Sequence, residues 1–224
     1  QPKITVLSPN GGENLRFRPH AKDELAHYAK AAEDIEYKFP FGWHEIEGIH
    51  NRGDWDLSRH SKFSGADLSE KDPKTGQKFY PYIIETSAGA DRLTLAFLID
   101  AYEEIAGGRT TTTKSIKESE IVLRLHKKLA PIKVAVLPLS KKSELTEPAF
   151  KVYRELHKHF MCQYDETGSI GKRCRQAEIG TPFCVTFDFD SIEDKKVTVR
   201  DRDTMEQVRI AIVDLVKYLE DKLR

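Results

Sequence analysis

An apolar strand, a short polar turn and an apolar helix follow one another at residues 83–98, where the sequence is Ile-Ile-Glu-Thr-Ser-Ala-Gly-Ala-Asp-Arg-Leu-Thr-Leu-Ala-Phe-Leu. Glu85 and Ser87 lie two residues apart, so strand alternation points both side chains to one face. Gly89 lacks a Cβ where backbone could approach a ligand, and Arg92 carries a fork of donors suited to phosphate. The segment offers an anion for an ammonium group and a cation for a phosphate. The alternative is an ordinary strand-to-helix junction with a surface salt bridge.

Two further carboxylates, Glu45 and Glu47, lie two residues apart in a strand that the sequence predicts at residues 43–50. The same alternation predicts that they share a face, where they could bind Mg²⁺ or a substrate ammonium. The alternative for this pair is a structural ion pair. Asp54 and Asp56 have the same spacing but follow a glycine turn, so helix capping is the favoured interpretation for them.

A cluster of cations forms a third candidate site. The chain has 36 basic and 36 acidic residues and no formal net charge, so a nucleic-acid surface must be a local patch. The densest patch combines Lys172, Arg173 and Arg175 with Arg200 and Arg202 in a later strand. The alternative is a solvated helix face.

The elements that position these residues follow from apolar periodicity. Before residue 105 the sequence predicts a helix at 23–32, strands at 43–50 and 79–85, a turn at 72–76 and a helix at 91–104. After residue 120 it predicts strands at 133–139, 161–164, 183–189 and 196–201, helices at 147–160 and 169–177, and a final helix capped by Thr204. Alternating strands and helices predict an α/β fold class, α+β overall, with a mixed sheet in the later part.

Residues 105–120 lose this periodicity and contain Gly-Gly and four successive threonines. They predict a boundary after residue 110, a linker at 111–120 and a second domain at 121–224. A length of 224 residues with 39% hydrophobic and 32% charged residues suits one or two soluble globular domains without a membrane span. Three cysteines cannot all pair, which favours a reducing, cytoplasmic setting.

The segment from Glu85 to Arg92 resembles the third signature motif of class II aminoacyl-tRNA synthetases in its glycine-specific form. Other runs are similar to glycyl-tRNA synthetases in the same order: Gly-Trp-His-Glu-Ile-Glu-Gly-Ile at 42–49, Asp-Trp-Asp-Leu at 54–57, Ala-Pro-Ile-Lys-Val-Ala-Val-Leu-Pro-Leu at 130–139, Glu-Ile-Gly-Thr-Pro-Phe at 178–183 and Val-Arg-Asp-Arg-Asp at 199–203. The resemblance extends from about Leu15 to the end of the chain.

The resemblance implies roles for the candidate residues. Glu85 and Ser87 would belong to a glycine pocket, with Glu85 pairing the ammonium group. Arg92 would contact ATP phosphate and stabilise charge as pyrophosphate leaves, while Glu45 and Gly89 would also line the ATP site. ATP would be a substrate, and Mg²⁺ would bind Glu45 or Glu47.

The resemblance also implies an architecture and partners. Residues 1–110 would be part of an antiparallel-sheet catalytic domain, and residues 121–224 an anticodon-binding domain that contacts tRNA-Gly through the basic patch. The full-length enzyme would be a homodimer. The first and second class II motifs are not found in this sequence, so we expect a C-terminal portion that is inactive alone. The rival hypothesis is a non-catalytic binding protein on the same fold, as in the accessory subunit of mitochondrial DNA polymerase.

Overall fold

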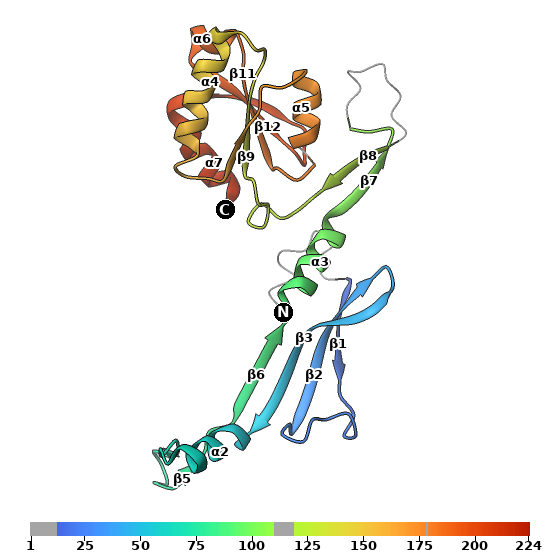
Figure 1. Ribbon diagram of the computed structural model, residues 1–224, viewed down its shortest axis with the longest axis vertical. Coiled ribbons are helices and arrows are strands. Elements are labelled where there is room, and N and C mark those ends of the chain that lie inside the picture. The colour runs from blue at the N-terminus through green and yellow to red at the C-terminus, as the bar shows by residue number, and fades with distance from the viewer. Residues whose placement is uncertain (1–12, 110–118, 178) are drawn as a thin grey trace. The chain divides into compact units, whose positions relative to one another are not determined.

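The protein consists of two compact units, Gln1–Ile99 and Asp100–Arg224, each with its own sheet (Figure 1). The computed structural model describes residues 13–109, 119–177 and 179–224. The units divide before β7, whereas the sequence predicts a boundary after residue 110. Most of the predicted linker at 111–120 lies outside the described residues, and its last two residues belong to β8. The predicted α/β fold class is confirmed by the mixture of antiparallel and mixed sheets.

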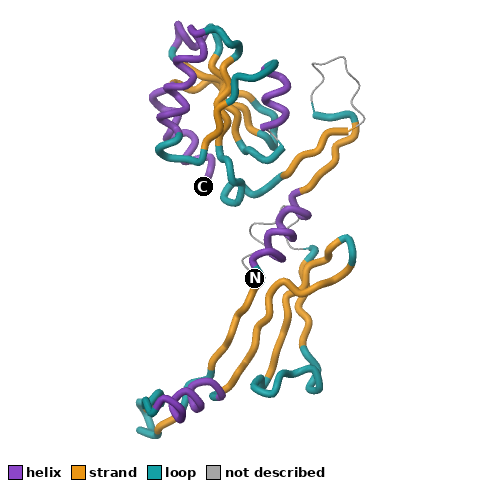
Figure 2. Tube along the Cα trace, viewed as in Figure 1, coloured by secondary structure: helices purple, strands orange, loops and turns teal. Residues whose placement is uncertain are grey.

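The first unit is built on a four-stranded antiparallel sheet with the order β1-β2-β3-β6 (Figure 2). Its strands are β1 (Leu15–Pro19), β2 (Ala31–Phe39), β3 (Gly42–Gly53) and β6 (Ile83–Ala88). Between β3 and β6 lie helix α2 (Trp55–Ser64) and the small hairpin of β4 (Glu70–Lys71) and β5 (Lys78–Phe79). Helix α3 (Ala90–Ala101) follows β6 directly.

Alternation along β2 separates an apolar face of this sheet from a polar face. Ile35, Tyr37 and Phe39 are buried and belong to one hydrophobic cluster with Ile46 of β3 and Ala96 of α3. The intervening side chains of β2 point to the other face, because successive residues of a strand alternate. Helix α3 therefore covers one face, and the opposite face holds the polar side chains.

Two predictions for the first unit fail, whereas the strand at 43–50 is confirmed as part of β3 and the helix at 91–104 as α3, which ends at Ala101. The helix predicted at 23–32 is absent, because residues 23–30 form the turn that brings β2 back beside β1 and Ala31 already begins β2. Glu24 bonds Arg18 and the Ala21 amide in this turn. The strand predicted at 79–85 is interrupted between β5 and β6. The turn at 72–76 is confirmed, since Gly76 N donates to Asp72 O at 2.8 Å.

The second unit holds a five-stranded mixed sheet with the order β10-β9-β11-β12-β13. Its strands are β9 (Val134–Pro138), β10 (Cys162–Tyr164), β11 (Phe183–Phe187), β12 (Lys196–Asp201) and β13 (Gln207–Ala211). Its helices are α4 (Ser143–Leu156), α5 (Ile170–Ala177), α6 (Asp190–Asp194), the 3₁₀ turn η1 (Ile212–Asp214) and α7 (Leu215–Leu223). Strands β10, β9 and β11 run parallel, and β12 and β13 continue the sheet antiparallel.

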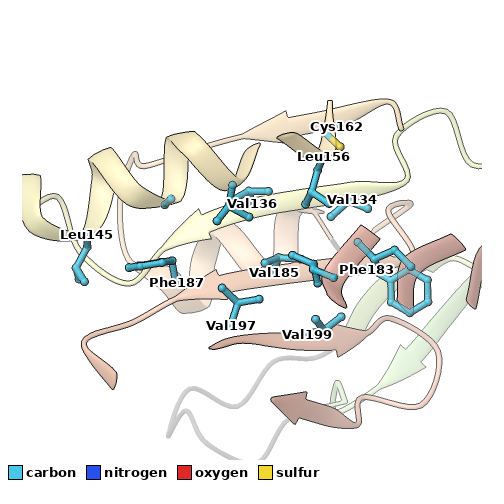
Figure 3. Close-up of a cluster of buried hydrophobic side chains, with 14 residues drawn as sticks. Val134, Val136, Leu145, Leu156, Cys162, Phe183, Val185, Phe187, Val197 and Val199 are labelled. Atoms are coloured by element: carbon cyan, nitrogen blue, oxygen red, sulfur yellow. The ribbon is translucent and has the colours of Figure 1, made fainter. Parts of the chain in front are cut away.

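The main core of the second unit lies between this sheet and helices α4 and α7. Alternate strand residues such as Val134, Val136 and Val185 point into it, against Leu145 and Leu156 of α4 (Figure 3). A smaller cluster on the opposite face of the sheet contains Ala135, Leu137, Cys184 and Cys174 of α5. Helix α5 thus covers the second face (Figure 1).

The final helix starts later than the sequence predicts. Thr204, the expected cap, lies in a turn where Met205 has a φ of 63° and Asp201 Oδ1 accepts a hydrogen bond from Asp203 N at 2.7 Å. The chain then returns as β13 beside β12, and α7 begins only at Leu215. Pairing with an existing strand outweighs the local helical pattern.

A separate hairpin of β7 (Tyr102–Ala106) and β8 (Ser119–Leu123) also belongs to the second unit. Arg124 N donates to Ala101 O and Leu123 N to Ile179 O, each at 2.6 Å. The buried Arg109 pairs with Glu120 at 3.1 Å. No helix in the described part of the chain is long and apolar enough to cross a membrane.

Candidate functional site

Glu85 and Ser87 share the polar face of the first sheet. In the antiparallel pair of β3 and β6, Glu85 lies opposite His50 and Ser87 lies opposite Gly48. Residues directly opposite each other in such a ladder point to the same face. A Cβ at Gly48 would lie 3.0 Å from Cε1 of His50, so only glycine fits there without moving the His50 ring.

Among the described residues, Arg52 is the hydrogen-bond partner of Glu85. Arg52 Nη1 donates to Glu85 Oε2, and the same guanidinium bonds Asp56 at 2.6 and 2.9 Å. Hydrogen bonds to Asp56, and then to Glu85, raise the pKa of Arg52, which stays charged. The second carboxylate oxygen of Glu85, Oε1, accepts no hydrogen bond from the described residues. The Glu85 side chain is 37% exposed, so Oε1 can accept a donor from a ligand.

Arg92 and Glu45 come together at the junction of β6 and α3. Arg92 Nη1 donates to Glu45 O at 3.0 Å and lies 3.7 Å from Glu45 Oε2. Both side chains are about half exposed, so this ion pair is weak and the arginine remains open to an anion. A Cβ at Gly89 would meet only Arg92 side-chain carbons at 3.8 Å or more, an ordinary contact. The fold itself does not require glycine at this position.

The prediction that Glu45 and Glu47 share a face is wrong. A β-bulge shifts the register of β2 and β3 between Ile35 and Glu36, so that Glu45 lies opposite Glu36 and Glu47 opposite Ile35. The extra residue, Ile46, changes which face each carboxylate takes. Glu45 lies on the polar face, whereas Glu47 is aligned with the apolar side of β2.

The polar face also contains charged residues that sequence reasoning missed. Asp34 and Glu36 of β2 are both buried. Asp34 contacts His20 at 2.8 Å, and Glu36 contacts Arg16 at 2.5 Å. The signal that could have found them is the alternation of Asp34 and Glu36 with the apolar Ile35, Tyr37 and Phe39 along β2.

Two members of the predicted basic patch are interior residues. Arg173 is 2% exposed and donates to the carbonyls of Asp165 and Pro138, both at 2.7 Å. Arg202 is 1% exposed and donates to the carbonyls of Gly180 and Leu125. The prediction that Arg173 and Arg202 are surface contacts for tRNA is wrong, because each guanidinium is buried and donates hydrogen bonds to buried backbone oxygens.

Of the remaining members of the patch, Arg200 lines a pocket on the α5 side of the second sheet, and Lys172 is a residue of α5. Lys172 is exposed, Arg200 is half-buried, and the side chain of Arg175 lies outside the described part of the chain. The pocket has a volume of about 320 Å³. Its lining comes from α5, from polar positions of β11, β12 and β13, and from the residues that follow β9 and β11: Leu139, Ile170, Gly171, Cys174, Thr186, Asp188, Thr198, Arg200 and Gln207.

The pocket exists because α5 is short. Its buried Cys174 packs with Ala135, Leu137 and Cys184 of β9 and β11. The polar side chains of β12 and β13 on the same face therefore line an open hollow beside the helix. The pocket offers hydroxyl, amide and guanidinium groups and the carboxylate of Asp188 to a small polar ligand.

Comparison with known proteins gives consistent results for both units. The family model described as "Anticodon binding domain" matches residues 133–222. Curated relatives include the glycine-tRNA ligases of Caldanaerobacter subterraneus subsp. tengcongensis, 59% identical over 95% of this chain, and Geobacillus kaustophilus, 57% identical over 94%. The chain spans 44% of the length of each of these two relatives.

A solved structure shows the same fold. It is the prolyl-tRNA synthetase from Cryptosporidium parvum complexed with L-proline and AMP, with a TM-score of 0.59 and 20% identity. The likeness covers 93% of this chain and 42% of that one.

Proposed function

Because this chain belongs to the glycine-tRNA ligase family, we propose that it carries part of the machinery that joins glycine to tRNA-Gly with ATP. The observation that supports the proposal most is the placement of Glu85 and Ser87 on one face, the polar face, of the first sheet. Arg92 and Glu45 meet at the end of the same strand. An anion for the ammonium group and a cation for phosphate thus lie on one short segment.

The first reaction is the activation of glycine. The glycine carboxylate attacks the α-phosphorus of ATP, the bond to the β-phosphate oxygen breaks, and pyrophosphate leaves glycyl-adenylate behind. Glu85 Oε1 holds the ammonium group with help from Ser87, and Arg92 stabilises the negative charge that develops on the phosphates. No general base is needed, because the attacking carboxylate is ionised at neutral pH. The 3′-terminal hydroxyl of the tRNA then attacks the glycyl carbonyl and AMP leaves.

Mg²⁺ fits this scheme through Glu45 and ATP together. No group of three or more His, Cys, Asp or Glu side chains among the described residues could hold a metal ion. Mg²⁺ commonly binds through one or two carboxylates plus substrate phosphates, so Glu45 would supply one oxygen and ATP the others. The bound ion would neutralise charge on the phosphates.

The second unit would bind the anticodon arm of tRNA-Gly through Lys172, Arg200 and the pocket beside α5. A cytoplasmic setting and a homodimer of the full-length enzyme complete the proposal. The rival function, a nucleic-acid-binding accessory protein without catalysis, has no use for a glycine pocket. The presence of Glu85, Ser87 and Arg92 therefore favours the ligase.

The test uses a full-length glycine-tRNA ligase in which these 224 residues replace the matching segment. We expect Glu85→Gln to lower kcat/KM for glycine by an equivalent of about 2–4 kcal/mol, since it removes a charge-assisted hydrogen bond to the ammonium group. The KM for ATP should change little. Glycine-dependent pyrophosphate exchange measures both, and an unchanged glycine dependence would place Glu85 outside the pocket.

A further inference from the structure

A second β-bulge places Arg52 beside the proposed glycine pocket. The register of β3 and β6 shifts between Asn51, which pairs with Ile84, and Gly53, which pairs with Ile83. Arg52 is the extra residue at this shift. Gly53 has a φ of 59°, a left-handed conformation that glycine adopts readily. Bulges of this kind redirect a side chain. Here the redirected side chain reaches Glu85.

Three contacts hold the Arg52 guanidinium in place. Asp56, in the first turn of α2, accepts hydrogen bonds from Nε and Nη2, and the guanidinium lies 4.1 Å from the centre of the Tyr28 ring. The third contact is the bond from Nη1 to Glu85. The Arg52 and Asp56 side chains are each 21% exposed, so water competes only to a limited extent for the hydrogen bonds between them. A bidentate arginine-carboxylate pair has a defined geometry, so the guanidinium presents Nη1 to Glu85 in a fixed direction.

Arg52, Asp56 and Glu85 form a cluster whose net charge suits an ammonium ligand. The guanidinium of Arg52 is balanced by Asp56, and the charge of Glu85 is left over, so the three side chains carry one net negative charge. Without Asp56, Arg52 would neutralise Glu85 and weaken its attraction for a cation. The pair of Arg52 and Asp56 thus orients Glu85 without cancelling its charge.

We propose that Arg52, balanced by Asp56, is a positioning residue that fixes Glu85 Oε2 and presents Oε1 to the ammonium group of glycine. This inference rests on the proposed function of Glu85. It makes Arg52 and Asp56 determinants of glycine affinity although neither is expected to touch glycine. The alternative is a purely structural role, in which the contacts of Arg52 with Asp56 and Glu85 only link β3, α2 and β6.

The two interpretations differ in the effect of Arg52→Gln. If Arg52 only links β3, α2 and β6, its removal acts on glycine through charge alone, and the two negative charges left on Glu85 and Asp56 predict tighter glycine binding. Loss of positioning predicts weaker binding, because Glu85 then samples orientations that do not face the ligand. We expect the KM for glycine to rise by about tenfold and the KM for ATP to stay within about twofold.

Two further variants complete the experiment. Arg52→Lys keeps the charge but cannot bond Asp56 twice and Glu85 at once, so it should give an intermediate rise in the KM for glycine. Asp56→Asn retains an acceptor for Arg52 but leaves the cluster neutral, and should also raise the KM for glycine. Lys62→Gln, an exposed cation on α2, is the matched control and should change neither constant.

The assay is pyrophosphate exchange with the full-length ligase that carries these 224 residues, with thermal unfolding of each variant measured in parallel. If Arg52→Gln does not fold, Arg52→Lys and Asp56→Asn decide the question. Two results for Arg52→Gln would overturn the inference: a fall in kcat with the KM values for glycine and ATP both unchanged, or a lower KM for glycine. Glu85→Gln distinguishes failure of the proposed glycine pocket from failure of the positioning role of Arg52. If Glu85→Gln raises the KM for glycine while the Arg52 and Asp56 variants do not, only the positioning role fails. If Glu85→Gln has no effect, the pocket assignment fails as well.

Discussion

At the scale of single residues, charged side chains in this chain have different tasks according to their burial. Arg92 and Glu45 are half exposed and open to a ligand, whereas Arg173 and Arg202 are buried against backbone carbonyls. Arg202 has in addition a carboxylate partner, Asp203, at 2.8 Å. Burying a guanidinium costs free energy that hydrogen bonds to these carbonyls offset.

The Asp203 pair makes stability depend on pH. Burial tends to raise the pKa of Asp203, but its hydrogen bond with Arg202 and the nearby charges of Arg202, Arg124 and Lys127 outweigh burial, so the pKa lies below the ordinary value of 3.8. A carboxyl group with a lowered pKa in the folded state stabilises the fold above its unfolded pKa and loses that contribution as pH falls through the folded value. The pair should therefore stabilise the second unit at neutral pH and progressively less below about pH 4.

We predict that Asp203→Asn lowers the free energy of unfolding by about 1–3 kcal/mol at pH 7, because it leaves buried donors of Arg202 without a charged acceptor. The difference between variant and parent should shrink towards pH 3. Chemical denaturation at both pH values measures it. Asp221→Asn, which removes an exposed surface pair with Arg224, is the control and should have little effect. A difference that does not depend on pH would refute the assigned role of Asp203.

At the scale of elements, the short helix α5 decides which part of the second sheet can bind a ligand. It covers β9 and β11 and leaves polar positions of β12 and β13 open. Its residue Lys172 is exposed, and Arg200 of β12 lines the pocket. The face covered by α4 and α7 holds the main hydrophobic core. The proposed tRNA contacts therefore belong to the α5 face.

We predict that the double variant Lys172→Ala and Arg200→Ala weakens the binding of tRNA-Gly by the 224-residue chain. Loss of two phosphate contacts should reduce the slope of log affinity against log salt concentration by about 1 to 2. Gel-shift assays over a range of salt concentrations measure both quantities. Lys151→Ala, an exposed cation on α4, is the matched control. Unchanged affinity of the double variant at low salt would show that the patch lies elsewhere.

At the scale of the whole molecule, the division into units follows the hydrophobic clusters and the hairpin of β7 and β8. Each of the three clusters lies within one unit. The hairpin belongs to the second unit and is tied to it by Arg109, which pairs with Glu120 and donates to Arg202 O at 2.6 Å. Arg124 adds an ion pair to Glu103 of β7. A domain that began at residue 121 would lack these contacts.

We therefore predict that residues 100–224 fold alone and unfold at a higher temperature than residues 121–224. Loss of β7 and of both ion pairs removes several stabilising interactions, and each kcal/mol corresponds to several °C in Tm for domains of this length. Thermal unfolding followed by circular dichroism compares the two fragments. Equal Tm values would favour a boundary at residue 121 over the division before β7.

The sequence by itself determined the features that depend on local periodicity. Alternation in a strand is local, so the shared face of Glu85 and Ser87 and strand β9 were predictable, as was the α/β fold class. The turn at 72–76 was predictable because Asp72 and Gly76 favour it locally. The candidate glycine and ATP residues followed from the resemblance of the Glu85 to Arg92 segment to a family motif, and their roles remain predictions.

Only the tertiary structure decided the features that depend on distant partners. The bulge at Ile46 separates Glu45 from Glu47, and the bulge at Arg52 brings that arginine to Glu85; both arise from the register with neighbouring strands. Strand β13 replaces a predicted helix because β12 offers it a ladder of hydrogen bonds. Arg173 and Arg202 are buried because distant carbonyls need donors. Their sequence pattern is that of surface cations, and only the packing around them shows otherwise.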